Sequence, residues 1–449
     1  MSNKDGEKTH YNKMTDSPVS KLLITLSIPT ILSMMITSLY NIVDTAFVGT
    51  LGTSESGATG VVVGFMAILQ AVAFMCGQGA GSLMSRRLGA KENKEATMYS
   101  STGFFLCFGL GLSISILSFI FMKPLLRLLG STVTIEPYAK TYISYILISA
   151  PFFTSSLTMN NLLRYEGKAK LGTIGLITGS VLNIFGDAFF IFVLKMGIGG
   201  AGLATASSQI VSFLILISMF LRGKTETKLS LKYISRDASV FFEIAATGFP
   251  SLLRQGLNSV ATMILNQKAG IYGDQAVAAM SIVSRISFFP LAVAIGVGQG
   301  FQPISAYNYG AGKKNRVKEA FFSALKGSEI VLLMMSVPIY IYAPQIIRFM
   351  RDDAAVVEIA VRALRLTCIA QLFMPLTMMT EMGFQSIGKK ALASIGSSLR
   401  SGLIFVPSVI ILAKYRGLAG VQESQPLAFM ITFVLCLFLG RIYLKEISE

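Results

Sequence analysis

Two aspartates lie inside long apolar stretches of the chain, Asp44 near the N-terminus and Asp187 before the middle. A carboxylate at the centre of a lipid bilayer costs roughly 2.5–3.5 kcal/mol on insertion scales, so we expect both residues to serve a function. Tyr40 precedes Asp44 by one helical turn. Asn183 precedes Asp187 by one turn, and residues at this spacing share a helix face. If the two faces meet, two carboxylates, an amide and a phenol form one cluster.

Such a cluster is suited to bind a monovalent cation. Two carboxylates held close together in a dry site retain a proton near neutral pH, because they cannot both be ionised at low cost. The same oxygen atoms suit Na⁺ as ligands. Asp44 and Asp187 each lie one to two turns before the end of their stretches, so we expect them at similar depth in the outer half of the membrane. A second interpretation stays open, in which both are solvated residues at the level of the lipid headgroups.

The composition indicates that membrane-spanning helices position these residues. Of 449 residues, 53% are hydrophobic and only 14% are charged, and the mean hydropathy is +0.63. The apolar residues come in blocks of about 20, the length of a spanning helix. A closed barrel would need polar–apolar alternation, which the sequence lacks. We therefore predict an all-α integral membrane protein. The twelve predicted spans are 22–49, 58–85, 98–122, 138–163, 171–194, 201–221, 240–267, 276–304, 319–343, 361–386, 392–413 and 420–444.

The two halves of the chain repeat each other with an offset of 221 residues. Prolines and glycine-containing motifs recur in the same order. The matched positions are Pro29 and Pro250, Gly77-Gln78-Gly79 and Gly298-Gln299-Gly300, Gly89-Ala90 and Gly310-Ala311, and Gly167-Lys168 and Gly388-Lys389. A duplication of six spans gives two homologous bundles that face the same way, as in some secondary transporters.

This duplication predicts the domain organisation. The two six-helix lobes are 22–221 and 240–444, with a linker 222–239, a loose N-terminal tail 1–21 and a C-terminal tail 445–449. At the same offset, Asp44 is replaced by Leu265 and Asp187 by Ser408. The carboxylates are therefore not needed to build a half, which favours a functional role.

The formal net charge of +16 indicates the orientation of the chain in the membrane more than it indicates binding of a nucleic acid. Most lysines and arginines of the predicted loops lie on one side of the membrane, including those in 86–97, 222–239 and 313–318. This bias follows the positive-inside rule and predicts that both termini are cytoplasmic. The only histidine, His10, is in the tail, so a histidine proton relay is excluded. The nearest match to a nucleotide-binding loop, 383–390, lacks the final Ser or Thr, so we expect an ion gradient to supply the energy.

Further residues have weaker claims to a role in transport. Glu381 lies within a span of the second half and, with Gln255 and Met280, could form a substrate site or a second acidic site. Met280 belongs to a large set of methionines that could line an adaptable apolar cavity. Pro29 removes a helix hydrogen bond in the first span and is a predicted hinge.

Several of these motifs resemble those of the multidrug and toxic compound extrusion (MATE) family, in its MepA-like branch from Gram-positive bacteria. They are the repeated Pro29 and Pro250, Asp44-Thr-Ala-Phe-Val-Gly49, Gly77-Gln-Gly-Ala-Gly-Ser-Leu-Met-Ser-Arg-Arg-Leu-Gly-Ala90 and Asn183-Ile-Phe-Gly-Asp187. The resemblance covers all twelve spans and implies a V-shaped pair of six-helix lobes. It implies an N-terminal ion site made of Tyr40, Asp44, Asn183, Asp187 and Thr205. Gln255 stands where some relatives carry a glutamate, which argues against a second-lobe cation site of their kind.

We therefore expect a secondary active multidrug efflux antiporter and not an enzyme. The resemblance implies export of cationic amphipathic drugs or dyes in exchange for H⁺ or Na⁺, by rocking of the two lobes. We expect a monomer in the bacterial cytoplasmic membrane, contributing to antibiotic resistance, with no cofactor, no multivalent metal and no nucleic-acid partner. The alternatives are a flippase for lipid-linked precursors from the same superfamily and, in a different class, a membrane-embedded enzyme.

Overall fold

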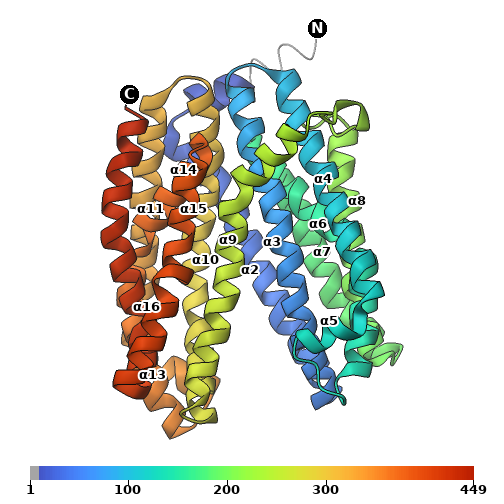
Figure 1. Ribbon diagram of the computed structural model, residues 1–449, viewed down its shortest axis with the longest axis vertical. Helices are drawn as coiled ribbons and strands as arrows, with labels where there is room; N and C mark the ends of the chain where they lie inside the picture. Colours follow the sequence, from blue (N-terminus) through green and yellow to red (C-terminus); the bar gives the residue numbers. More distant parts are fainter. Residues whose placement is uncertain (1–9, 449) are drawn as a thin grey trace. The chain divides into compact units, whose positions relative to one another are not determined.

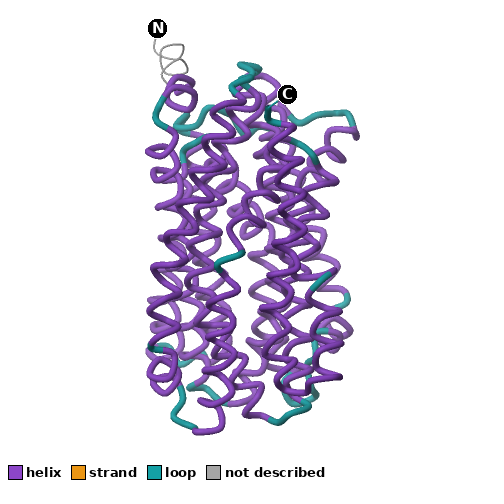
Figure 2. The backbone as a smooth tube through the Cα atoms, turned by 90° about the vertical axis from the view of Figure 1, so that its left-hand side faces the viewer, coloured by secondary structure: helices purple, strands orange, loops and turns teal. Residues whose placement is uncertain are grey.

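The computed structural model describes residues 10–448, which are almost entirely helical with short connections and no strand (Figure 2). Figure 1 labels most of the helices. Their bounds are α2 Val19–Gly49, α3 Thr53–Gly89, α4 Asn93–Ile120, α5 Met122–Leu128, α6 Glu136–Tyr165, α7 Ala169–Asp187, α8 Gly197–Leu221, α9 Ala238–Gly270, α10 Asp274–Gly310, α11 Lys314–Ile341, α12 Ala343–Met350, α13 Ala354–Gln371, α14 Met374–Ile387, α15 Lys390–Ser398 and α16 Phe405–Glu446. Two π-helical segments, η1 (Ala188–Val193) and η3 (Leu399–Leu403), follow α7 and α15, and a short 3₁₀ segment, η2 (Leu231–Tyr233), precedes α9.

Twelve membrane spans account for these helices. Within residues 10–448, nine helical segments are long and apolar enough to cross a membrane by themselves. One of the nine, Lys390–Glu446, holds two spans that turn at Gly417, where the positive φ of 61° suits a residue without a Cβ. The tenth span is divided between α13 and α14, and α9 is less apolar because Arg254 lies in its middle. The structure thus agrees with the predicted all-α architecture.

The chain forms two compact units whose limits fall inside helices. Among the described residues, unit 1 comprises 32–252 with His10 and Tyr11, and unit 2 comprises Asn12–Ile31 with 253–448. The division therefore falls two residues after Pro29 in α2 and two residues after Pro250 in α9. These units differ from the lobes 22–221 and 240–444, which stay a prediction, because the first part of α2 and the first part of α9 are exchanged.

Close glycine contacts explain the exchange. In unit 1, a Cβ on Gly79 of α3 would overlap the backbone of Ile244 in α9. In unit 2, a Cβ on Gly300 of α10 would overlap Ser27 in α2. Since Gly79 and Gly300 are repeat partners, the duplicated motif makes the same helix contact twice, each time with the exchanged segment. Small residues that let helix backbones approach closely are a main source of packing in membrane proteins.

The described part of the N-terminal tail is packed against the fold, unlike the prediction from the sequence. Of the predicted loose tail 1–21, residues 1–9 lie outside the described part. Residues 10–16 are helical. The side chains of Met14 and Val19 are fully buried. The Nζ atom of Lys313 donates a hydrogen bond to Asp16 at 2.6 Å. This part of the tail is therefore packed and not loose. The hydrogen bond from Lys313 also holds the pKa of Asp16 below its ordinary value.

The predicted linker 222–239 packs onto unit 1. The buried carboxyl of Glu166, just after α6, accepts hydrogen bonds from the backbone of Glu226 at 3.0 Å and of Thr227 at 2.9 Å. The Thr227 hydroxyl donates to the same carboxyl at 2.5 Å. These bonds fix the linker against the end of α6, so the connection between the repeats is not a free tether.

Candidate ion-binding site

Three helices of unit 1 carry the predicted site residues. Asp44 lies on α2, Asp187 is the last residue of α7, and Thr205 lies on α8. Helix α7 packs against α8 and α6. A Cβ on Gly186 of α7 would lie 3.1 Å from the Cβ of Ala204, so the absence of a side chain there allows α7 and α8 to approach closely. This close approach lets polar groups of the two helices reach each other.

The carboxyl groups of Asp44 and Asp187 are near neighbours that interact electrostatically. Asp44 is 8% exposed and Asp187 is fully buried. The Oδ1 atom of each residue is buried and has no hydrogen-bond partner. The pair therefore presents two oxygen atoms that a bound cation would satisfy.

Asn183 connects this pair to α8. With its NH₂ group toward Asp187, the amide donates to Oδ2 at 3.2 Å, and its oxygen accepts from the Thr205 hydroxyl at 3.2 Å and the Thr205 backbone N–H at 3.3 Å. We assign this orientation because it satisfies all of these groups. Tyr40 lies within electrostatic range of both aspartates. The structure thus brings together all five residues that the sequence and the resemblance placed in the site.

A sixth residue, Tyr142 of α6, belongs to the same cluster. Its hydroxyl lies 3.5 Å from the Thr205 hydroxyl, and both aspartates are among its charged neighbours. Sequence reasoning missed it because it is one of 15 tyrosines and its spacing marks nothing unusual. Only the packing of α6 against α8 places it here.

No basic side chain among the described residues balances the two carboxyls. Within residues 10–448, no lysine or arginine pairs with Asp44 or Asp187. The described chain also contains no group of three or more His, Cys, Asp or Glu side chains that could hold a metal ion. Two carboxyls with neutral oxygen ligands suit a proton or a monovalent cation, since a buried charge needs a compensating partner.

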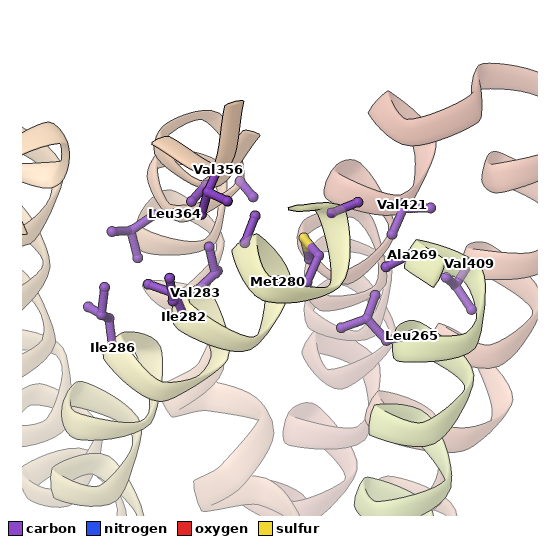
Figure 3. Close-up of a cluster of buried hydrophobic side chains, with 14 of the residues drawn as sticks. Leu265, Ala269, Met280, Ile282, Val283, Ile286, Val356, Leu364, Val409 and Val421 are labelled. Atoms are coloured by element: carbon purple, nitrogen blue, oxygen red, sulfur yellow. The ribbon is translucent and has the colours of Figure 1, made fainter. Parts of the chain in front are cut away.

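The equivalent place in unit 2 is hydrophobic core. Leu265, the repeat partner of Asp44, is 4% exposed and belongs to one cluster of buried apolar side chains (Figure 3). Val409, next to the repeat partner of Asp187, lies in the same cluster. Met280 is also part of it and is 2% exposed, as expected of a core residue. The described part of unit 2 therefore has hydrophobic core where unit 1 has the aspartate pair.

The remaining predicted residues are not grouped into one site. Glu381 of α14 is 2% exposed, and its Oε1 atom lies 2.5 Å from Nη1 of Arg254 in α9. Gln255, the next residue of α9, is only partly buried, and Met280 lies in the hydrophobic cluster. Pro29 lies inside α2, which continues through it without interruption.

A duplicated set of six membrane helices, with a buried carboxyl pair in one of the two sets, is typical of one class of protein, the secondary transporters. Comparison with known protein families identifies the family within this class. The MatE family model matches residues 29–189 and 250–411, and the chain therefore belongs to the MatE family. The two matched stretches begin at Pro29 and Pro250, which confirms the duplication and its offset of 221 residues. The resemblance to the MATE family is likewise confirmed.

Similar proteins are multidrug exporters. The chain is 27% identical over 426 residues to "Multidrug export protein MepA" of Staphylococcus saprophyticus, covering 95% of this chain and 93% of that protein. It is 26% identical to MepA of Staphylococcus aureus with the same coverage. A solved structure of a multidrug resistance MATE family transporter, described as outward-facing, matches with a TM-score of 0.92 and 26% identity over 97% of this chain and 98% of that one. The chain is a multi-pass protein of the bacterial membrane and a transporter by family.

Proposed function

We propose that this protein is a multidrug efflux antiporter that exports cationic amphipathic compounds in exchange for H⁺ or Na⁺. The observation that carries the proposal is the neighbouring pair of Asp44 and Asp187, which is buried in unit 1 and has no basic partner among the described residues. A structural ion pair would include a cation from the protein. This pair lacks one, so the coupling ion is the partner that completes it. The export of drugs by similar proteins supports the substrate class.

The proposed cycle couples ion binding to a change in α2. H⁺ or Na⁺ binds between Asp44 and Asp187 and removes their mutual repulsion, which changes the preferred path of the helix that carries Asp44. Pro29 lies in the same helix, two residues before the division between the compact units, which supports it as the hinge. Export is coupled to the ion only if ion and drug differ in affinity between two states of the lobes.

The test is ion-driven efflux by purified protein in proteoliposomes. We would measure release of the fluorescent cation ethidium under an imposed pH gradient or an imposed Na⁺ gradient. The wild type should respond to one of the two, which identifies the coupling ion, and Asp44→Asn should not respond. Asp352→Asn is the matched control, because Asp352 is an exposed carboxylate of unit 2.

Two results would count against the proposal. Normal ion-driven efflux by Asp44→Asn would remove the aspartate pair from coupling. Absence of gradient-driven efflux of any cationic dye by the wild type would favour a flippase, and translocation of a lipid-linked precursor would be measured next. The orientation with both termini cytoplasmic is tested separately, by labelling single cysteines introduced at the two ends of the chain.

A further inference from the structure

Unit 2 contains a second buried cluster of charges, and its net charge is positive. It consists of Arg254 on α9, Glu381 on α14 and Arg400 in the π-helical segment η3. These side chains are 8%, 2% and 7% exposed. Arg254 and Glu381 form an ion pair of 2.5 Å, so one carboxylate stands against two guanidinium groups. Because arginine keeps its proton in proteins, these three side chains together carry a charge of +1 within the membrane-spanning part of the unit.

Arg400 is the group left without full compensation. Its Nη1 atom is buried and has no hydrogen-bond partner, although Glu381 and Arg254 are its charged neighbours. An unpartnered buried charge is among the costliest features a fold can contain. Glu381 is already bound to Arg254, and the backbone of Glu381 would lie 3.6 Å from a Cβ on Gly396, one turn before Arg400. This packing fixes η3 beside the pair.

The cluster is not required to build a six-helix half. At the offset of 221 residues, its three positions correspond to Ser33, Asn160 and Gly179 in unit 1, none of which is charged. The π-helical backbone at Arg400 also favours a functional role, since single π-helical turns in α-helices occur frequently at functional sites. Glu381 also cannot serve as a second cation site in this arrangement, because the two guanidinium groups would repel a cation.

We propose that Arg400 and Arg254 bind a monovalent anion, either a halide or a singly charged oxyanion such as a carboxylate. One negative charge neutralises the cluster and gives Nη1 of Arg400 its missing acceptor. The planar fork of a guanidinium group is the side chain best matched to an oxyanion. The anion comes either from solution or from the headgroup phosphate of a lipid with net negative charge, such as phosphatidylglycerol, in which no choline cation competes for the phosphate. This binding does not depend on the proposed antiport.

Anion binding is measurable as a rise in thermal stability. The chain has no tryptophan but four buried free cysteines (Cys76, Cys107, Cys368 and Cys436), so a thiol-reactive fluorescent dye reports unfolding of the detergent-purified protein. Sodium chloride or sodium formate would replace sodium gluconate, a bulky anion, at constant Na⁺ and ionic strength. We expect a saturable rise in the unfolding temperature of the wild type. Arg400→Met should raise the half-saturating anion concentration at least tenfold, whereas Arg285→Met, at an exposed arginine of α10, should leave it unchanged.

A second variant tests whether the positive charge of the cluster is what binds the anion. Glu381→Gln removes the competing negative charge and should lower the half-saturating anion concentration about tenfold, a coupling of the size that nearby charges produce. If Arg400→Met does not fold, Arg400→Lys keeps the charge without the fork and should bind the anion more weakly. A response that is absent in the wild type, equal in the wild type and the Arg400 variant, or weakened by Glu381→Gln would overturn the proposal.

Lipid vesicles distinguish the two sources of the anion. The same titration is repeated after reconstitution into phosphatidylcholine alone and into phosphatidylcholine with phosphatidylglycerol. If the headgroup is the natural occupant, phosphatidylglycerol should stabilise the wild type, remove its chloride response and leave Arg400→Met unaffected. If the occupant is a free ion, the chloride response should be the same in both membranes.

Discussion

Replacing Asp187 by asparagine should stabilise the protein and at the same time abolish ion-coupled transport. Asparagine keeps an oxygen where Oδ2 accepts from Asn183, and it puts an NH₂ group in place of Oδ1, which has no partner. Asp44 is a near neighbour of Asp187, and its own buried Oδ1 also lacks a partner and can accept a hydrogen bond from that NH₂ group. Satisfying a buried acceptor is worth about 1–3 kcal/mol, and removing one of two adjacent charges adds to it. We therefore expect the free energy of unfolding to rise by about 1–3 kcal/mol.

Both effects are measured on the same preparation. A gain of this size should raise the unfolding temperature by a few degrees, because each kcal/mol moves the midpoint of a large protein by only about 2–4 °C or less. The thiol-reactive dye reports unfolding, and ethidium release from proteoliposomes reports transport. Asp352→Asn, an exposed carboxylate, should change neither quantity.

A lower unfolding temperature for Asp187→Asn would refute this reasoning, because it would mean that the carboxyl pair stabilises the fold. Normal ion-driven efflux by the variant would refute it as well. A stabilised but inactive variant would instead identify the pair as a place where folding stability is given up for ion binding.

Three further changes have defined outcomes. Gly248→Ala should lower the free energy of unfolding by about 3 kcal/mol, because the new Cβ would overlap the backbone of α3. Gly60→Ala is the control, because no atom lies within 4 Å of its Cβ, and it should change the free energy of unfolding by about 1 kcal/mol at most. Thermal unfolding measures both. Thr205→Val removes the hydroxyl that donates to Asn183 and should raise the ion concentration for half-maximal efflux about fivefold, the equivalent of one hydrogen bond of about 1 kcal/mol. Burial raises the pKa of Glu166 above its ordinary value of 4.5, so the folded state holds the proton more tightly. The contribution of Glu166 to stability should therefore fall as pH rises from 4.5 through the raised pKa, and Glu166→Gln should flatten this part of the profile of unfolding temperature against pH.

The spans, the repeat and much of the candidate site could be predicted from the sequence because each depends on local spacing. Apolar length defines a span whatever its neighbours are. Tyr40 and Asp44 share a face because they are one turn apart, and Asn183 and Asp187 do so for the same reason. That the two faces meet required one assumption, similar depth, which the positions of both aspartates near the ends of their spans supplied.

What escaped sequence reasoning depends on contacts between segments far apart in the chain. No periodicity indicates that Arg254 meets Glu381, residues separated by 127 positions. Taken alone, each arginine within a span could extend to the headgroup region, and only the fold shows that two of them meet a carboxylate. The exchange of the first parts of α2 and α9 is equally non-local, because it rests on which helix faces Gly79 and Gly300.

Comparison of the two repeats distinguishes residues that hold the helices together from residues that bind ions. Gly79 and Gly300 occupy equivalent positions and make equivalent close contacts, so any six-helix half of this kind needs them. The charged clusters behave in the opposite way, since neither has a counterpart in the other half. Each also contains buried atoms without partners, on Asp44 and Asp187 in unit 1 and on Arg400 in unit 2. A fold that can be built without these atoms, yet keeps them unpaired at a cost in stability, retains them for ligands that complete them: cations in unit 1 and, by the same reasoning, an anion in unit 2.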